Sequence, residues 1–148
     1  MSTQTDLTVR KSVSVNCSPS DAFALFTERL ETWWPFDTHC PGSEPPEEFV
    51  FEGHEGGRVF HRVAGGTEYE WATVVEWEPP SRFVANWHVT PGQPTTELEV
   101  RFVPDGGGTR VELEHRGWER YGDDAAEEYA SYNRGWEPVL ARYVAKVG

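Results

Sequence analysis

Two histidines are the residues of this sequence best placed for acid–base chemistry. Alternating strand patterns put His61 between Val59 and Val63, and His115 in line with Leu113, so both imidazoles are expected on the buried side of a sheet. An inward-facing imidazole can act as a general base or as a polar anchor for a ligand. The alternative is a histidine that is hydrogen-bonded within the core, and the pattern favours this structural interpretation for both. Whether the two meet across a cavity is left open.

The other candidate groups form no recognisable catalytic or metal-binding motif. His39-Cys40 and the histidines downstream follow no zinc-ligand spacing. Cys17 precedes a helix start, where a thiolate can be stabilised, but no motif pairs it with a histidine. The glycine pairs lie in hairpins rather than between a strand and a helix, so they are not phosphate loops. We expect no metal and no cofactor, and no catalytic residue is assigned.

Aromatic residues are the stronger signal for a binding site. The chain has 7 Trp, 5 Tyr and 8 Phe, and Tyr and Trp combine a large apolar body with a polar tip, which suits an amphipathic ligand. Alternation predicts that residues of each of two strands share a face: Tyr69, Trp71, Thr73, Val75 and Trp77 on the first, Phe83, Ala85 and Trp87 on the second. Such residues either fill a core or line a cavity, and the pattern is consistent with both.

A long helix over residues 123–148 is expected to cover this aromatic face. Its large apolar residues recur at steps of three and four, which places them on one stripe: Tyr129, Tyr132, Trp136, Val139, Leu140, Tyr143, Val144 and Val147. Two residues oppose a straight helix, because Gly135 is a poor helix former and Pro138 crowds the carbonyl of Arg134. The sequence therefore predicts a kink near 134–138 or two abutting helices.

The rest of the chain predicts one curved sheet. A strand over 7–15 precedes a helix that opens at Ser18-Pro19, with Ser18 as N-cap, and a short helix over 28–34. After a loop over 36–48 come six strands, expected at 49–52, 58–63, 68–77, 82–89, 95–103 and 109–116. The simplest arrangement is an α+β fold, a curved antiparallel sheet wrapped around the terminal helix. A helix seldom seals such a sheet along its whole length, so we expect a cavity between them.

Composition limits the partners. The net charge of −12 argues against nucleic acid and anionic membranes. No apolar run approaches the roughly 20 residues of a membrane span, and the start lacks the core of a signal peptide, so a cytoplasmic protein is predicted. Residues 1–148 are expected to form a single domain with a disordered tail at 1–6, as a monomer or a homodimer.

Several short motifs stand in the order of a known family. They are SPSDAFALFTE at 18–28, Trp33-Trp34-Pro35, Gly56-Gly57-Arg58, VVEWEPP at 74–80 with Arg82 and Trp87, GGTRV at 107–111 leading to HRGW at 115–118, and Gly135-Trp136 with Leu140. With them the chain resembles, over roughly residues 9–147, the activator of heat-shock-protein-90 ATPase homologue-like family within the SRPBCC or START-like superfamily. The resemblance implies a helix-grip fold, a hydrophobic or amphipathic small molecule under the long helix, and a cavity mouth near 33–36.

The favoured hypothesis is a protein that binds a small hydrophobic or aromatic molecule, rather than an enzyme. The expected site comprises the aromatic walls Trp33, Trp34, Phe36, Trp71, Trp87, Tyr132 and Trp136, with His61 and His115 as polar anchors. One alternative is a cyclase-, dehydratase- or hydrolase-type enzyme that uses the same cavity, with His115 or His61 as the base. Another, implied by the resemblance, is a chaperone cofactor, although the namesakes act with an additional domain that this sequence does not contain.

Overall fold

A computed structural model describes residues 7–42, 44–90 and 92–147. The tail expected at 1–6 lies outside these described residues. In chain order the elements are β1 (Val9–Val15), α1 (Pro19–Phe26), the 3-10 turn η1 (Leu30–Thr32), β2 (Glu48–Phe51), β3 (Arg58–Arg62), β4 (Glu68–Glu78), β5 (Arg82–Trp87), β6 (Thr96–Asp105), β7 (Gly108–Arg116), the 3-10 segment η2 (Trp118–Asp124) and α2 (Ala125–Val147).

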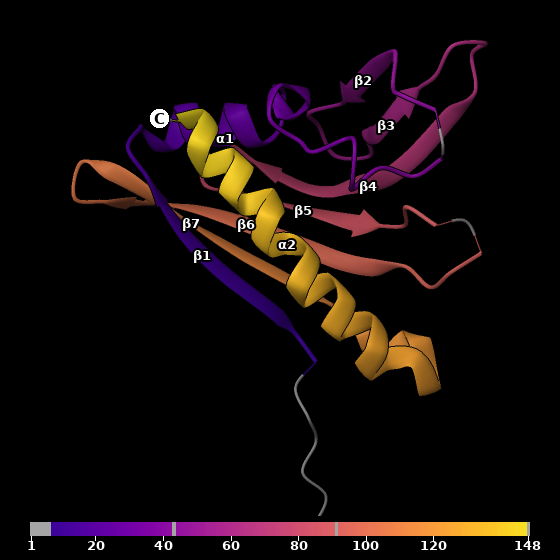
Figure 1. The fold of residues 1–148 in the computed structure, drawn as a ribbon. Coiled ribbons are helices and arrows are strands. Elements are labelled where there is room, and N and C mark those ends of the chain that lie inside the picture. Colours follow the sequence, from indigo (N-terminus) through magenta and orange to yellow (C-terminus); the bar gives the residue numbers. More distant parts are fainter. Residues whose placement is uncertain (1–6, 43, 91, 148) are drawn as a thin grey trace, which may run out of the picture.

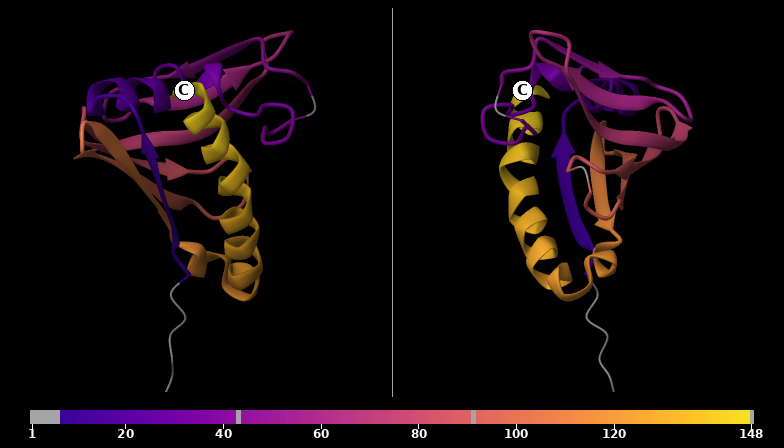
Figure 2. Two further views of the ribbon diagram at one scale, coloured as in Figure 1. Left: turned by 60° about the vertical axis from the view of Figure 1, so that its left-hand side comes forward. Right: turned by 90° about the vertical axis from the view of Figure 1, so that its right-hand side faces the viewer.

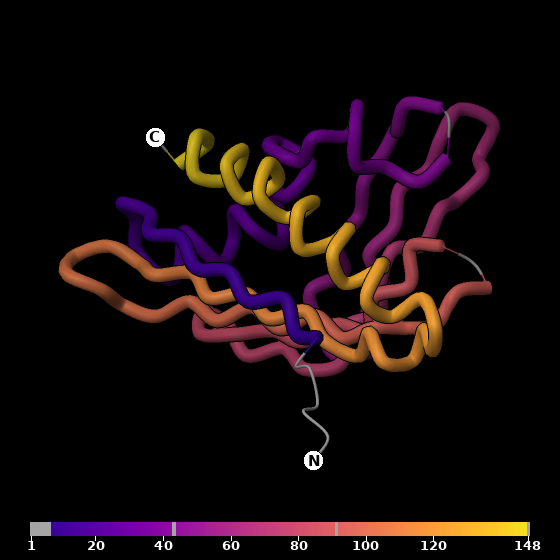
Figure 3. Tube along the Cα trace, turned by 60° about the horizontal axis from the view of Figure 1, so that its bottom comes forward, coloured from indigo at the N-terminus to yellow at the C-terminus, as the bar shows by residue number. Residues whose placement is uncertain are grey.

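The strands form one antiparallel sheet in the order β1-β7-β6-β5-β4-β3-β2. The first strand therefore lies beside the last (Figures 1 and 3), and in this pair Val13 is opposite Val111. The sheet curls, and α2 lies against its inner face (Figure 2). This arrangement confirms the predicted α+β helix-grip fold.

The turns next to α1 follow local sequence signals, with one exception. Ser18 caps α1, since its hydroxyl accepts the Asp21 amide at 3.1 Å, and Pro19 occupies the first turn. The second helix expected over 28–34 is wrong in extent, because only the single 3-10 turn η1 forms. Arg29 and Trp33 have non-helical backbone angles on either side of it, and Pro35 disfavours a longer helix.

The β6–β7 hairpin confirms the expected two-sided strands. Alternate residues of β7 are buried from Thr109 to His115. Its two-residue turn consists of Gly106 and Gly107, both with positive φ (57° and 91°), the conformation of a tight type I′ hairpin. A short turn of this kind fixes the register, so His115 faces the helix as predicted.

Strand β4 departs from the expected alternation. Its pairing shifts register between Val59 and Phe60 of β3 and again between Val74 and Glu76. As a result both Trp71 and Ala72 are buried, whereas Val75 is 40% exposed. The predicted common face of Tyr69, Trp71, Thr73, Val75 and Trp77 is therefore wrong, because bulges change which side chains point inward.

Helix α2 is one continuous α-helix that contains Pro138 (Figure 2), so of the two expected alternatives, a kink near 134–138 or two abutting helices, the second is wrong. Its buried stripe includes Trp136, Val139, Leu140 and Tyr143, as the spacing predicted. Packing of this stripe on the sheet compensates for the hydrogen bond that the proline cannot donate.

Within the described residues, no helix combines the length and apolarity that a membrane crossing requires.

The last turns of α2 lie over a filled core. Phe26 and Trp33 pack against Tyr143 with ring centroids 5.1 Å away in each case. The Tyr143 hydroxyl donates to the carbonyl of Ala22 at 2.9 Å, which ties α2 to α1. The space between helix and sheet is therefore closed at this end.

Candidate functional site

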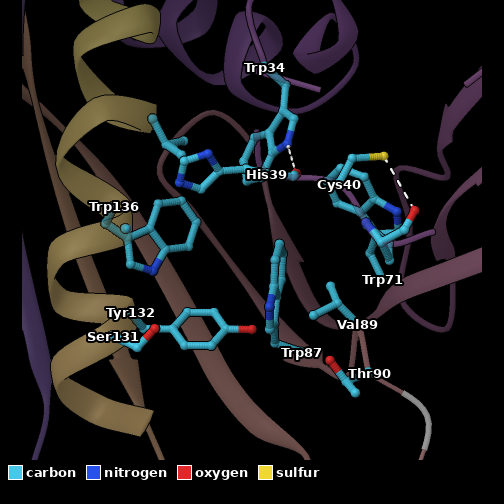
Figure 4. A pocket seen from close by; sticks show the side chains of 13 residues that line it. Trp34, His39, Cys40, Trp71, Trp87, Val89, Thr90, Ser131, Tyr132 and Trp136 are labelled. Atoms are coloured by element: carbon cyan, nitrogen blue, oxygen red, sulfur yellow. Dashed lines mark hydrogen bonds between the residues drawn. The ribbon is translucent and has the colours of Figure 1, made fainter. Parts of the chain in front are cut away.

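A cavity of about 320 Å³ lies between the sheet and the middle of α2 (Figure 4). Its volume is at the lower end of the range for small-molecule sites, about 300–1,000 Å³. Residues from α2, β4, β5 and the loops after η1 and β5 line it: Trp34, His39, Cys40, Pro41, Trp71, Trp87, Val89, Thr90, Ser131, Tyr132, Gly135, Trp136 and Val139. The buried end is aromatic, whereas Thr90 and Ser131 at the rim are exposed.

Four tryptophans form the buried end of the cavity. We refer to Trp34, Trp71, Trp87 and Trp136 as the tryptophan quartet. Centroids of neighbouring indoles are 5.2 to 6.2 Å apart around the quartet, from Trp34 to Trp71, Trp87, Trp136 and back to Trp34. Each indole is at most 9% exposed. Contacts at these spacings and inclined angles hold the indoles in place and make a preformed apolar wall.

The indole N–H groups of three quartet members donate within the protein. Trp34 donates to the carbonyl of His39 at 2.6 Å. Trp71 donates to Nδ1 of His61 at 2.9 Å, and Trp136 donates to Nδ1 of His115 at 3.1 Å. Trp87 differs, because its buried Nε1 has no hydrogen-bond partner among the described residues.

His115 lies behind the wall rather than in the cavity. The Trp136 indole can only donate, so Nδ1 of His115 must accept, and Nε2 carries the proton that it donates to Thr96 Oγ1 at 2.7 Å. The imidazole is fully buried. Burial, with a smaller contribution from the Arg116 charge, lowers the pKa of His115 to about 3. A neutral imidazole with both nitrogens engaged orients Trp136 and is a poor general base.

His61 accepts a hydrogen bond from a quartet indole in the same way, on the other side of the cavity. It is also fully buried, it stacks on Tyr69 with centroids 5.0 Å apart, and burial lowers its pKa. Because Trp71 donates to Nδ1, the proton lies on Nε2, which is 3.8 Å from the Cys40 sulfur. Each of the two inward-facing histidines thus fixes one tryptophan of the quartet.

The buried state of His115 predicts an acid-sensitive stability. In the unfolded chain His115 takes up a proton near pH 6.5. In the folded protein its pKa is lowered, so the buried imidazole stays neutral down to about pH 3. The stability of the folded protein is therefore not reduced by this group above the unfolded pKa of about 6.5, and it decreases as the pH falls below that value. Between pH 6.5 and 5 we expect this group alone to lower the free energy of unfolding by about 1.5 kcal/mol.

The measurement is a set of urea titrations of the wild type and a His115→Gln variant across that range. Glutamine keeps a donor and an acceptor but does not titrate. The contributions of His61 and the other titratable groups are the same in both proteins, so they cancel when the two pH dependences of the unfolding free energy are subtracted. The variant is expected to show the shallower pH dependence. Equal dependence in the two proteins would show that His115 does not resist protonation.

The rim carries polar residues that strand and helix periodicity does not identify. His39 and Cys40 come from the loop after η1, and the Nδ1 of His39 lies 2.7 Å from the Thr38 hydroxyl. A Cβ built at Gly135 of α2 would lie 3.8 Å from Nε2 of His39, so that glycine keeps space at the helix surface. Burial raises the pKa of the Cys40 thiol, which does not favour a nucleophilic thiolate.

Of the nine predicted site residues, the structure brings five together around the cavity: Trp34, Trp71, Trp87, Tyr132 and Trp136. Trp33 packs instead in the filled core and donates to the carbonyl of Leu25 at 2.8 Å. Phe36 packs on Phe49 and on Trp71, with ring centroids 5.7 and 5.9 Å away. The other four predicted site residues therefore lie behind the side chains that line the cavity: Trp33, Phe36, His61 and His115.

Comparisons with known proteins agree with the fold. The family model described as "Activator of Hsp90 ATPase homolog 1-like protein" matches residues 16–146. Among solved structures, the chain is similar to Txn09, an anthrahydroquino-γ-pyrone synthase, with 36% identity over 95% of this chain and 96% of that chain and a TM-score of 0.62. It is also similar to CalC, a self-sacrificing resistance protein from Micromonospora echinospora, with 27% identity over 95% and 93% of the two chains and a TM-score of 0.72.

The Aha1 dimer from Colwellia psychrerythraea shares the fold at 17% identity, with 95% of each chain covered and a TM-score of 0.68. No curated protein sequence matches the chain significantly. The family match covers most of the sequence and agrees with the order of motifs and with the sheet wrapped around α2. The chain belongs to the family of Activator of Hsp90 ATPase homolog 1-like proteins, within the SRPBCC superfamily.

Proposed function

We propose that this protein binds a small, planar, polycyclic aromatic molecule in the cavity between the sheet and α2. The observation that carries the proposal is the tryptophan quartet at the buried end of a preformed cavity. Fixed indole faces favour a flat aromatic ligand, because stacked and edge contacts add to the burial of apolar area. The rigid wall also limits the ordering cost of binding.

Three further observations support this ligand class. The name of the similar synthase refers to an anthrahydroquinone, which is a fused aromatic system. The cavity volume of about 320 Å³ suits a ligand of a few fused rings rather than an extended lipid chain. The charge of −12 disfavours an anionic ligand, and the aromatic lining of the cavity suits a neutral one.

Native mass spectrometry tests this function. The freshly purified protein is mixed with an anthraquinone that carries one hydroxymethyl group for solubility, and spectra are recorded under native and denaturing conditions. We expect a one-to-one complex under native conditions that disappears on denaturation. A protein that stays free at saturating compound, with no co-purified ligand in the cavity, would contradict the proposal.

A second candidate is an enzyme that transforms such a ligand, and the similarity to a synthase over nearly the whole chain favours it. His61 and His115 are poorly suited as bases, because each donates and accepts within the protein. His39 is the histidine among the lining residues. On this alternative a His39→Gln variant binds the aromatic ligand normally but loses turnover, whereas unchanged turnover would remove His39 from the mechanism.

A further inference from the structure

The unpartnered indole of Trp87 is the starting point. Its Nε1 is buried, and no described residue accepts its proton, whereas the other three members of the tryptophan quartet donate to protein acceptors. A buried donor without an acceptor destabilises the folded protein, because the hydrogen bond that the group makes with water in the unfolded chain is lost and not replaced. An unsatisfied buried polar group in a folded protein needs an explanation, and in a cavity a ligand atom that completes the hydrogen bond is one.

Tyr132 supplies a second donor at the same place. Its ring comes from α2, and Figure 4 shows the hydroxyl directed toward the Trp87 indole. Burial raises the pKa of Tyr132 and the Glu128 charge adds to the rise, whereas the Trp87 indole N–H beside the phenol oxygen opposes it. The net effect is a raised pKa, so the phenol stays protonated at neutral pH and can donate. The pair does not form a hydrogen bond of normal geometry, since Trp87 Nε1 has no partner among the described residues.

We propose that Trp87 Nε1–H and the Tyr132 hydroxyl together form a two-donor anchor for a carbonyl oxygen on the polycyclic ligand, so that the protein selects aromatic ketones and quinones over the parent hydrocarbons. This inference rests on the proposed function and names the chemical group that the cavity recognises. A carbonyl oxygen has two lone pairs and can accept from both donors at once.

The electrostatic surroundings select a neutral acceptor over a phenolate. The Glu128 carboxylate contributes to the raised pKa of Tyr132, so a negative ligand atom at the anchor would meet the same repulsion. The overall charge of −12 acts in the same direction. A ketone or quinone oxygen avoids this cost and still satisfies the buried indole.

The test compares two compounds of equal shape, anthraquinone and anthracene, each with the same hydroxymethyl group. Their affinities are measured by equilibrium dialysis for the wild type, Trp87→Phe and Tyr132→Phe. We expect the wild type to bind the quinone about tenfold more tightly than the hydrocarbon. Each variant keeps an aromatic ring but loses one donor, so the ratio of the two affinities should fall to about threefold or less, because any loss of stacking area weakens both compounds alike and cancels in the ratio.

Tyr129→Phe is the matched control, because it removes a hydroxyl from the same helix outside the residues that line the cavity. It is expected to keep the wild-type preference. Wild-type protein that binds both compounds equally, or variants that both retain the preference, would overturn the anchor and leave the proposed function intact. If neither compound binds any of the proteins, the proposed function fails and the anchor fails with it.

Discussion

The Gly135→Leu variant will fold at least as stably as the wild type and will bind the aromatic ligand on the order of a hundredfold more weakly. Gly135 lies in the middle of α2 and lines the cavity, and a Cβ there meets only His39 Nε2 at 3.8 Å. A leucine side chain extends beyond that atom into the space the ligand would occupy, and overlap of this kind costs about 1–3 kcal/mol. Leucine also removes the helix penalty of glycine, about 1 kcal/mol.

Gly135→Ala separates these two effects. It brings the same gain in helix propensity but adds one methyl group at ordinary contact distance, so it should be more stable than the wild type and bind almost normally. Thermal unfolding and fluorescence titration of the three proteins provide both quantities. Undiminished affinity in the leucine variant would place the ligand elsewhere on the protein.

Trp136→Ala is expected to have the largest effect on stability. The residue is 3% exposed, contacts Trp34 and Trp87 in the quartet, and donates to His115. Loss of a buried tryptophan costs about 3–5 kcal/mol. Removal of one wall of the cavity should also weaken ligand binding by at least about tenfold in protein that remains folded.

Trp136→Phe is the informative partner of that variant. It keeps an aromatic wall but leaves Nδ1 of the buried His115 without a donor, which costs about 1–3 kcal/mol. Urea unfolding should therefore rank the proteins wild type, Phe, Ala. If the phenylalanine variant is as stable as the wild type, the indole–imidazole bond does not hold the wall.

The fold was largely predictable because its strands and helix obey simple periodicities. The alternation of Val111, Leu113 and His115 survives in β7, where a two-residue glycine turn fixes the register. Strand β4 does not keep its alternation, since bulges beside Trp71 and Val75 are set by pairing with neighbouring strands rather than by the strand itself. Pro138 does not divide α2 into two helices, because packing of the buried stripe on the sheet outweighs the local effect of the proline.

The kinds of residue that line the cavity were predictable, but which of them reach the cavity and which pack behind it was not. Aromatic residues of the central strands and of α2 were expected at the cavity, and Trp71, Trp87, Tyr132 and Trp136 line it. Trp33 and Trp34 are adjacent in sequence, yet one packs in the core and the other in the quartet, because the turn after η1 separates their directions. His39 was considered only as a metal ligand and not as part of the cavity lining, since an irregular loop has no periodicity that indicates where its side chains point.

A crystal structure of the protein with the hydroxymethyl-anthraquinone is the most direct test of whether the cavity binds an aromatic compound. The proposed function predicts that the rings lie against the tryptophan quartet, and the further inference predicts a carbonyl oxygen within hydrogen-bond distance of Trp87 Nε1 and the Tyr132 hydroxyl. A compound bound to the outer face of the sheet, or a cavity filled by its own side chains at saturating compound, would contradict the account.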